Sequence, residues 1–186
     1  MTGLNYQRMK DGFLPDISYE DLELTYDRKE DFGCTASFSS LLFYEKRPLR
    51  NGGFFMNSPM RKAPDRIDMG WAMLADIACS VWEQLRRLLE IADVQPERIL
   101  GCGGGLRSRN LCRMIAELSG KEIVLKEGFE QATLLGLVKI CNDALGETDR
   151  PAVGERVIRP GENRLIKDYH TVWLKNRMQM NAVRPE

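Results

Sequence analysis

Three consecutive glycines, Gly103, Gly104 and Gly105, separate a short apolar segment from a helical pattern. The apolar segment, Arg98–Cys102, is typical of a buried strand, and a helix is expected over residues 108–118. Because glycine has no Cβ, a flat ligand can approach the backbone closely at this turn. The first turn of the following helix also directs unpaired N–H groups and a positive dipole end toward the same place. This arrangement predicts a nucleotide site, and its plain alternative is a tight turn from strand to helix.

A dinucleotide site of the Rossmann type is the main enzymatic alternative. Gly101, Gly103 and Leu106 fall on the three glycine positions of that motif, so its third glycine is missing. Glu127 follows the next expected strand, where an acidic residue could contact a ribose. That motif usually opens its domain, whereas about half of this chain precedes it. The Rossmann interpretation therefore fits the sequence less well.

Charge and composition exclude several classes of protein. Lys plus Arg and Asp plus Glu number 27 each, so no net charge draws the chain to nucleic acid or to an anionic membrane. The chain contains no run of about 18 apolar residues, the length needed to span a bilayer, and the N-terminus lacks the apolar segment of a secretory signal. The cysteines are odd in number and form no C-x-x-C pair, which argues against a zinc site or a disulfide framework. They are expected to be buried thiols of a cytoplasmic protein: Cys34, Cys79, Cys102, Cys112 and Cys141.

Helices and strands are expected to alternate from residue 67 onward. This alternation predicts an α/β fold with a mixed or parallel sheet flanked by helices. Only two convincing core strands follow residue 67, and a parallel pair needs neighbours and two covered faces. The chain is therefore expected to hold part of a sheet whose other strands are missing. The expected helices cover residues 2–11, 18–28, 67–92, 108–118, 130–145 and 161–180, and the expected strands cover residues 37–44, 53–56, 98–102 and 123–125.

The segment around the glycines resembles a known motif. Ile99–Gly120 contains an apolar strand, the glycines, a small polar residue and a helix that reaches Ala116 and Glu117. This order is similar to the adenosine motif of the FGGY-type carbohydrate kinases, which are sugar, sugar-alcohol and glycerol kinases of the actin-like ATPase superfamily. That family usually has Ala-Asp where this chain has Ala-Glu. Further along, Ile123–Leu125 fits the next strand of the family, and Glu130–Gly136 fits its Ala-x-x-Leu-Gly turn.

Upstream segments resemble the same family in the same order. Gly3 and Gln7 match the start of a Gly-x-x-x-Gln-Trp segment, with Arg8 in place of the tryptophan. Leu42–Pro48 resembles the Pro-Tyr-x-x-Gly-Glu-Arg-x-Pro loop without its glycine, and Asn51–Met56 resembles the Ala-Arg-Gly-x-Phe strand. An ordered set of landmarks is far more specific than one glycine motif.

The resemblance implies a fold and a division of the chain. The fold would be a partial actin-like ATPase domain, of the ribonuclease H-like type, with a mixed sheet flanked by helices and with its first core strands missing. Residues 1–150 would form the C-terminal lobe of the kinase, truncated at its N-terminal side. Residues 151–186 would form a linker and a C-terminal tail helix.

The resemblance also implies an activity and a set of contacts. Such kinases use ATP and Mg²⁺ to phosphorylate a hydroxyl of a sugar or polyol, and the other lobe supplies the sugar site and the catalytic aspartate. This chain would supply the adenine-nucleotide-binding part and no catalytic or metal-binding residue. Glu130–Gly136 would support the pocket from behind. The adenine and ribose would contact Gly103, Gly104, Gly105 and Ser108, and Gly3 and Gln7 would approach the nucleotide from the other side.

A lobe with missing strands has consequences for partners. An uncovered sheet edge and helix face are expected to lead to self-association or to pairing with a complementing chain. The sugar would be bound only through the other lobe. The alternative function is a non-catalytic kinase remnant that acts as an oligomerisation or regulatory module. His170, in a helix that reads as polar, is expected at the surface, and Trp71 and Trp82 are expected to pack in the core or an interface.

Overall fold

The long helix α3 (Arg66–Ala92) runs through the middle of the computed structural model, which describes residues 2–39, 42, 45, 52–60, 63–148, 154–162 and 164–182. Asp65 caps its N-terminus in a capping box with Asp68, and Asp93 ends it with a φ of 53°. The helix confirms the prediction for residues 67–92. Small side chains make up much of its fully buried face and let neighbouring elements approach closely: Ala72, Ala75, Ala78 and Cys79.

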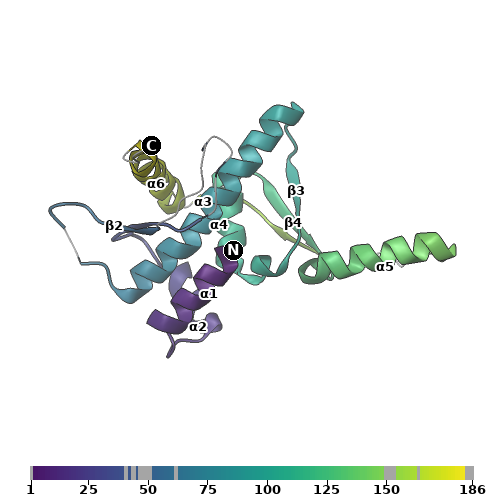
Figure 1. Cartoon of the computed structure of the whole chain (residues 1–186), viewed down its shortest axis with the longest axis horizontal. Coiled ribbons are helices and arrows are strands. Elements are labelled where there is room, and N and C mark those ends of the chain that lie inside the picture. Colours follow the sequence, from purple (N-terminus) through teal and green to yellow (C-terminus); the bar gives the residue numbers. More distant parts are fainter. Residues whose placement is uncertain are drawn as a thin grey trace.

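Two helices precede α3 in the chain and pack near it (Figure 1). α1 (Thr2–Phe13) contacts α3 and runs two residues beyond the helix expected over residues 2–11. α2 (Tyr19–Asp27) begins after Ser18, whose side-chain oxygen accepts a hydrogen bond from the Asp21 N–H at 3.1 Å. Both helices were expected, because their capping and turn residues are visible in the sequence.

A small antiparallel hairpin packs beside the N-terminal half of α3 (Figure 1). β1 (Thr35–Ser37) pairs with β2 (Gly53–Phe55), and Ala36 lies opposite Phe54. The strand expected over residues 37–44 is wrong: β1 ends at Ser37, and residues 38, 39 and 42 belong to no strand. The rest of that segment, and most of the family landmark over residues 42–48, lie outside the described residues.

A second sheet forms at the other end of α3. β3 (Arg98–Gly101) and β4 (Glu122–Lys126) are parallel, and β5 (Glu155–Ile158) adds antiparallel to β4, so the sheet is mixed as expected. β5 falls where a linker was expected. One face of the sheet packs toward α3 and α4 (Arg109–Ser119) through Ile99, Ile123 and Leu125, which join the core. In the described part of the chain, the outer edge of β3 has no strand beside it.

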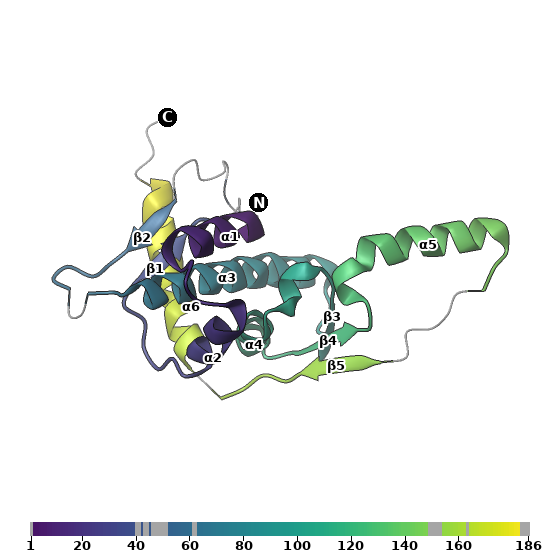
Figure 2. The same ribbon diagram turned by 90° about the horizontal axis from the view of Figure 1, so that it is seen from below.

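The helix α5 (Ala132–Leu145) extends away from the rest of the molecule (Figure 2). No residue of α5 is buried. Gly146 ends the helix with a φ of 71°, as the sequence predicts. Large apolar side chains along α5 are between 47% and 77% exposed: Leu134, Leu135, Leu137, Val138, Ile140 and Leu145.

The last helix, α6 (Leu165–Ala182), is part of the core, although its sequence reads as a polar tail. The Tyr169 hydroxyl accepts from the Ala36 N–H and donates to the Ala72 carbonyl, both at 2.9 Å, so it joins β1 to α3. His170 Nε2 lies 2.9 Å from Glu83 Oε1, and its side chain is only 16% exposed. The expectation of a surface histidine is therefore wrong, because α6 turns this face toward α3.

A buried polar network joins α3 and α6 to the segment after β1. Asp76 accepts hydrogen bonds from Trp173 Nε1 at 2.7 Å and from the Ser39 hydroxyl at 2.9 Å. Burial raises the pKa of Asp76, and these donors oppose that shift. Arg177 donates to both carboxylate oxygens of Glu45, at 2.6 and 2.8 Å, with both side chains almost fully buried.

The cysteines divide into two groups. Cys34, Cys79 and Cys112 are buried as expected, whereas Cys102 and Cys141 are exposed. Cys102 adjoins the glycines, and Cys141 lies on the exposed helix α5. Of the two tryptophans on α3, Trp71 is 2% exposed and packs in the core. Among the described helices, none combines the length and apolarity needed to cross a bilayer.

Candidate functional site

The glycines form a turn of their own between β3 and α4. A single 3-10 turn, Gly104–Arg107, follows β3, and α4 begins only after it, with Ser108 as its N-cap. Gly103 adopts a φ of 108°, which favours glycine, and its N–H donates to the Phe129 carbonyl at 2.7 Å. The glycines are therefore one turn farther from the helix N-terminus than a direct strand-to-helix connection predicts.

The structure requires glycine at two of the four glycine positions in this segment and leaves the other two open. At Gly101, a Cβ would lie 2.7 Å from Leu106 Cδ1 and 2.8 Å from Leu125 Cδ2, so packing excludes a side chain. At Gly103 the backbone conformation requires glycine. At Gly104 and Gly105 a Cβ would meet nothing within 4 Å, and neither has a positive φ. The last two thus form an open floor on which a flat ligand could lie.

The segment after β4 forms one side of the open space at Gly104 and Gly105. The turn Phe129–Gln131 packs against the glycine turn, and Arg107 Nε lies 3.6 Å from Glu130 Oε1. The Arg156 guanidinium lies 5.6 Å from the centre of the Phe129 ring and donates to the Leu106 carbonyl at 3.3 Å. These contacts join elements that are distant in the sequence, and they hold the turn Gly104–Arg107 in place.

A thiol lies beneath the same turn. Cys112 Sγ lies 3.2 Å from the Leu106 carbonyl and donates to it. Burial raises the pKa of Cys112 to about 11, so the thiol keeps its proton at neutral pH. Cys112 therefore supports the turn and is not poised as a nucleophile.

The N-terminus of α4 is already occupied by a carboxylate. The Ser108 side chain accepts from the Leu111 N–H at 3.1 Å and donates to Glu23 Oε1 at 2.5 Å. Glu23 Oε2 accepts from the Asn110 N–H at 2.9 Å. The N–H groups of this first turn were expected to be unpaired, which is wrong for Asn110 and Leu111. Glu23 lies 85 residues from Ser108 in the chain, so no local pattern could indicate this contact.

The predicted site residues do not all lie together. Gly103, Gly104, Gly105 and Ser108 lie in one continuous turn, whereas Gly3 and Gln7 lie on α1 and are exposed. α1 is held to the core by its contacts with α3, and the Tyr6 hydroxyl lies 3.4 Å from that of Tyr26.

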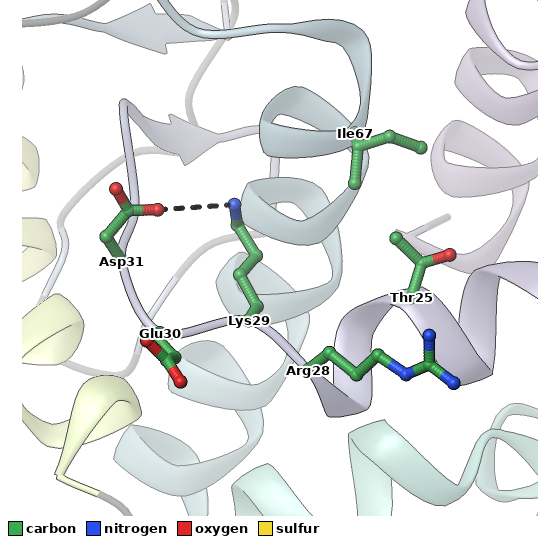
Figure 3. Close-up of a pocket in the computed structure, with 6 residues that line it drawn as sticks. All are labelled: Thr25, Arg28, Lys29, Glu30, Asp31 and Ile67. Carbon is green, nitrogen blue, oxygen red and sulfur yellow. Dashed lines mark ion pairs between the residues drawn. The ribbon is translucent and has the colours of Figure 1, made fainter.

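A separate hollow of about 630 Å³ lies between α2 and the start of α3 (Figure 3). Thr25, Arg28, Glu30 and Ile67 contribute to its lining. Lys29 also lines it, but the ammonium group pairs with Asp31 at 3.8 Å and with Asp68. None of the predicted site residues lines this hollow. Its lining carries charges of both signs and singles out no ligand.

Comparisons with known proteins agree on one family. Residues 36–145 match the sequence model described as the FGGY family of carbohydrate kinases, C-terminal domain. The chain is 33% identical over 175 residues to "Putative sugar kinase YoaC" of Bacillus subtilis (strain 168), an alignment that covers 93% of this chain and 36% of that protein.

Solved structures show the same fold at low sequence identity. Xylulose kinase from Lactobacillus acidophilus superposes with a TM-score of 0.69 at 17% identity, over 97% of this chain and 38% of that one. Glycerol kinase from Plasmodium falciparum, solved with ADP, gives a TM-score of 0.66 at 16% identity, over 99% of this chain and 37% of that one. The chain thus spans little more than a third of the length of these relatives.

Proposed function

The chain belongs to the FGGY family of carbohydrate kinases, and on that premise we propose that it supplies the adenine-nucleotide-binding part of an ATP-dependent kinase acting on a sugar or polyol hydroxyl. The observation that carries this proposal is the open floor at Gly104 and Gly105. Neither packing nor backbone conformation requires glycine at these two positions. Their place between β3 and α4 makes close approach of a ligand a physical reason for omitting both side chains.

The proposed contacts follow the geometry of the turn. The adenine lies over Gly104 and Gly105, and the ribose lies toward Gly103 and Ser108. Phe129–Gln131 and Arg107 form the wall beside the base, where a guanidinium can stack on a purine. Gly3 and Gln7 on α1 are proposed to face the nucleotide from the other side.

Phosphoryl transfer in the proposed kinase also involves the other lobe. The reaction depends on positioning and on neutralising charge, with Mg²⁺ held mainly by the phosphates and by one or two carboxylates. Following the family resemblance, we assign the catalytic base, the carboxylate ligands of Mg²⁺ and the sugar contacts to that lobe.

Uncovered apolar surface supports a second part of the proposal, that a further part of the kinase or a second copy of this chain covers α5 and the edge of β3. Leu100 on β3 is 62% exposed, and the apolar side chains of α5 are exposed along its whole length. Covering such side chains contributes about 25 cal/mol per Å². The cover is either the remaining part of a kinase or a second copy of this chain. The second possibility keeps open the alternative function, a non-catalytic module for oligomerisation or regulation.

Calorimetric titration with ADP and ATP tests the proposed site. We expect saturable binding that Gly104→Val abolishes, because the valine side chain fills the space of the base. Gly53→Val is the matched control: its Cβ also meets nothing within 4 Å, it lies in β2 at the opposite end of α3, and valine suits a strand. Absence of binding at millimolar nucleotide, or equal loss in both variants, contradicts the proposed function.

A further inference from the structure

Glu23 of α2 reaches across to the first turn of α4 and makes four contacts there. Its two carboxylate oxygens accept from the Ser108 hydroxyl at 2.5 Å and from the Asn110 N–H at 2.9 Å. The Asn110 side-chain amide donates to the Glu23 carboxylate and to the Glu23 carbonyl, each at 2.8 Å. Asn110 is 5% exposed, whereas Glu23 and Ser108 are half-buried, so these bonds are partly shielded from water.

The packing of α2 fixes the position of this carboxylate. Leu22 and Tyr26, on either side of Glu23, are buried at 1% and 4% exposure. One helical turn farther, Asp27 forms an ion pair with Arg113 of α4. Glu23 and Asp27 therefore hold α2 and α4 together at two successive turns, and Glu23 has little freedom to leave the helix N-terminus.

An anion at this place changes which part of a nucleotide the site can accept. A helix N-terminus ordinarily attracts phosphate through its free N–H groups and its dipole. Here a carboxylate already accepts from Asn110, and the Ser108 side chain accepts from Leu111. A phosphate at the same N–H groups would lie within a few ångströms of a like charge and be repelled.

Glu23 also acts on the glycine turn itself. Ser108 is at once the N-cap of α4 and the end of that turn, since its N–H donates to the Gly105 carbonyl at 3.3 Å. Holding the Ser108 hydroxyl therefore holds the backbone on which the base is proposed to lie.

We propose that Glu23 is the positioning residue that makes this a nucleoside site: it orders the Gly103–Ser108 turn and keeps phosphate away from the N-terminus of α4. The inference rests on the proposed function for the identity of the base. It adds that the phosphates of a bound nucleotide point away from the N-terminus of α4.

Three probes separate this role from a merely structural one. Adenosine, AMP and inorganic phosphate are titrated separately into the full chain and into Glu23→Gln, with amide chemical shifts as the readout. In the wild type we expect adenosine and AMP to bind with similar affinity and phosphate to leave the Asn110 and Leu111 amides unmoved. In Glu23→Gln we expect the affinity for AMP relative to adenosine to rise about tenfold, and phosphate to shift those two amides, because the helix N-terminus regains its attraction for anions.

Matched variants keep the outcome decisive. Glu20→Gln removes the same charge from an exposed position on the same helix and should change neither ratio. Glu23→Ala should weaken adenosine binding further than Glu23→Gln, because it also releases Ser108. An unchanged AMP-to-adenosine ratio in Glu23→Gln, with adenosine still binding, overturns the inference and leaves the proposed function intact. If the wild type binds no adenosine, the proposed function fails, and the phosphate titration alone decides whether Glu23 excludes anions.

Discussion

The two ends of α3 differ in how completely the chain covers itself. At the end where α6 crosses, a tryptophan, an arginine and two carboxylates are buried and fully engaged with one another. At the other end, no strand of the described residues pairs with the outer edge of β3, and α5 extends outward with no buried residue. Contacts within the chain stabilise the first end. At the second end the apolar surface, Gly104 and Gly105 are exposed, and we expect a further protein segment or a ligand to cover them.

Because of this difference, we expect the stability of the fold and the binding of ligands to depend on different parts of the molecule. Residues near α6 determine whether the chain folds, because unpaired polar groups there have no access to water. Residues near the glycine turn and α5 are largely exposed, so their substitution should change binding more than folding. The same comparison predicts the order of effects in the variants below.

The largest effect is expected at the buried ion pair. Arg177→Met should lower the free energy of unfolding by about 3–5 kcal/mol, because it leaves the Glu45 carboxylate buried without its cation. Urea denaturation followed by circular dichroism measures the change. Adding Glu45→Gln to Arg177→Met should restore part of the loss. A loss below about 1 kcal/mol for the single variant would show that water reaches this end as well.

The next effect distinguishes two glycines three residues apart. Gly101→Ala should destabilise the chain by about 1–3 kcal/mol, since its Cβ would collide with Leu106 and Leu125. Gly104→Ala should change stability by less than about 0.5 kcal/mol and act only on nucleotide binding. The same denaturation experiment compares the two. Equal destabilisation by both variants would remove the reason to regard Gly104 as a ligand position.

A smaller effect depends on pH. The hydrogen bond from His170 and the nearby Arg86 lower the pKa of Glu83, against the cost of burial. A carboxylate with a lowered folded-state pKa stabilises the fold above its unfolded pKa, and the contribution disappears as pH falls through the folded value. Wild type should therefore exceed Glu83→Gln in stability, by ~1 kcal/mol or less, near pH 6, and the difference should shrink as pH falls below the unfolded pKa of about 4.3. A difference that grows on acidification would contradict this sign.

The smallest effect on folding is expected on α5. Ile140 is 66% exposed, so Ile140→Lys should change the free energy of unfolding by less than about 0.5 kcal/mol. It should still reduce any self-association or binding of a complementing kinase segment, as measured by light scattering. Thr133→Lys, on the same helix, is the control because it introduces the same charge without removing an apolar side chain. A marked destabilisation by Ile140→Lys would mean that α5 packs against this chain.

Local patterns predicted the elements that depend on local physics. The periodicity of α3, the apolar run of β3 and the left-handed Gly120 after α4 are all legible in the sequence and are present in the structure. The strand β5 was missed because Glu155–Ile158 has only two apolar residues and is ordered by pairing with β4. Its neighbours in space, and not its own composition, make it a strand.

The errors at α6 and α4 have a different cause. α6 reads as polar because Arg177 and His170 count as surface residues until their partners, Glu45 and Glu83, are known. The carboxylate at the N-terminus of α4 comes from a distant helix, so a motif search finds Ser108 but not Glu23. Sequence patterns located the turn of the candidate site, and only the tertiary structure revealed what surrounds it.

Mapping amide shifts in the full chain during titration with ADP tests most directly whether the glycine turn holds the nucleotide. The largest shifts should fall on Gly103–Ser108 and on Phe129–Gln131, with little change at the hairpin of β1 and β2. No shift at millimolar ADP, or shifts gathered around the hollow lined by Thr25, Arg28 and Ile67, would contradict a nucleotide site at the glycines.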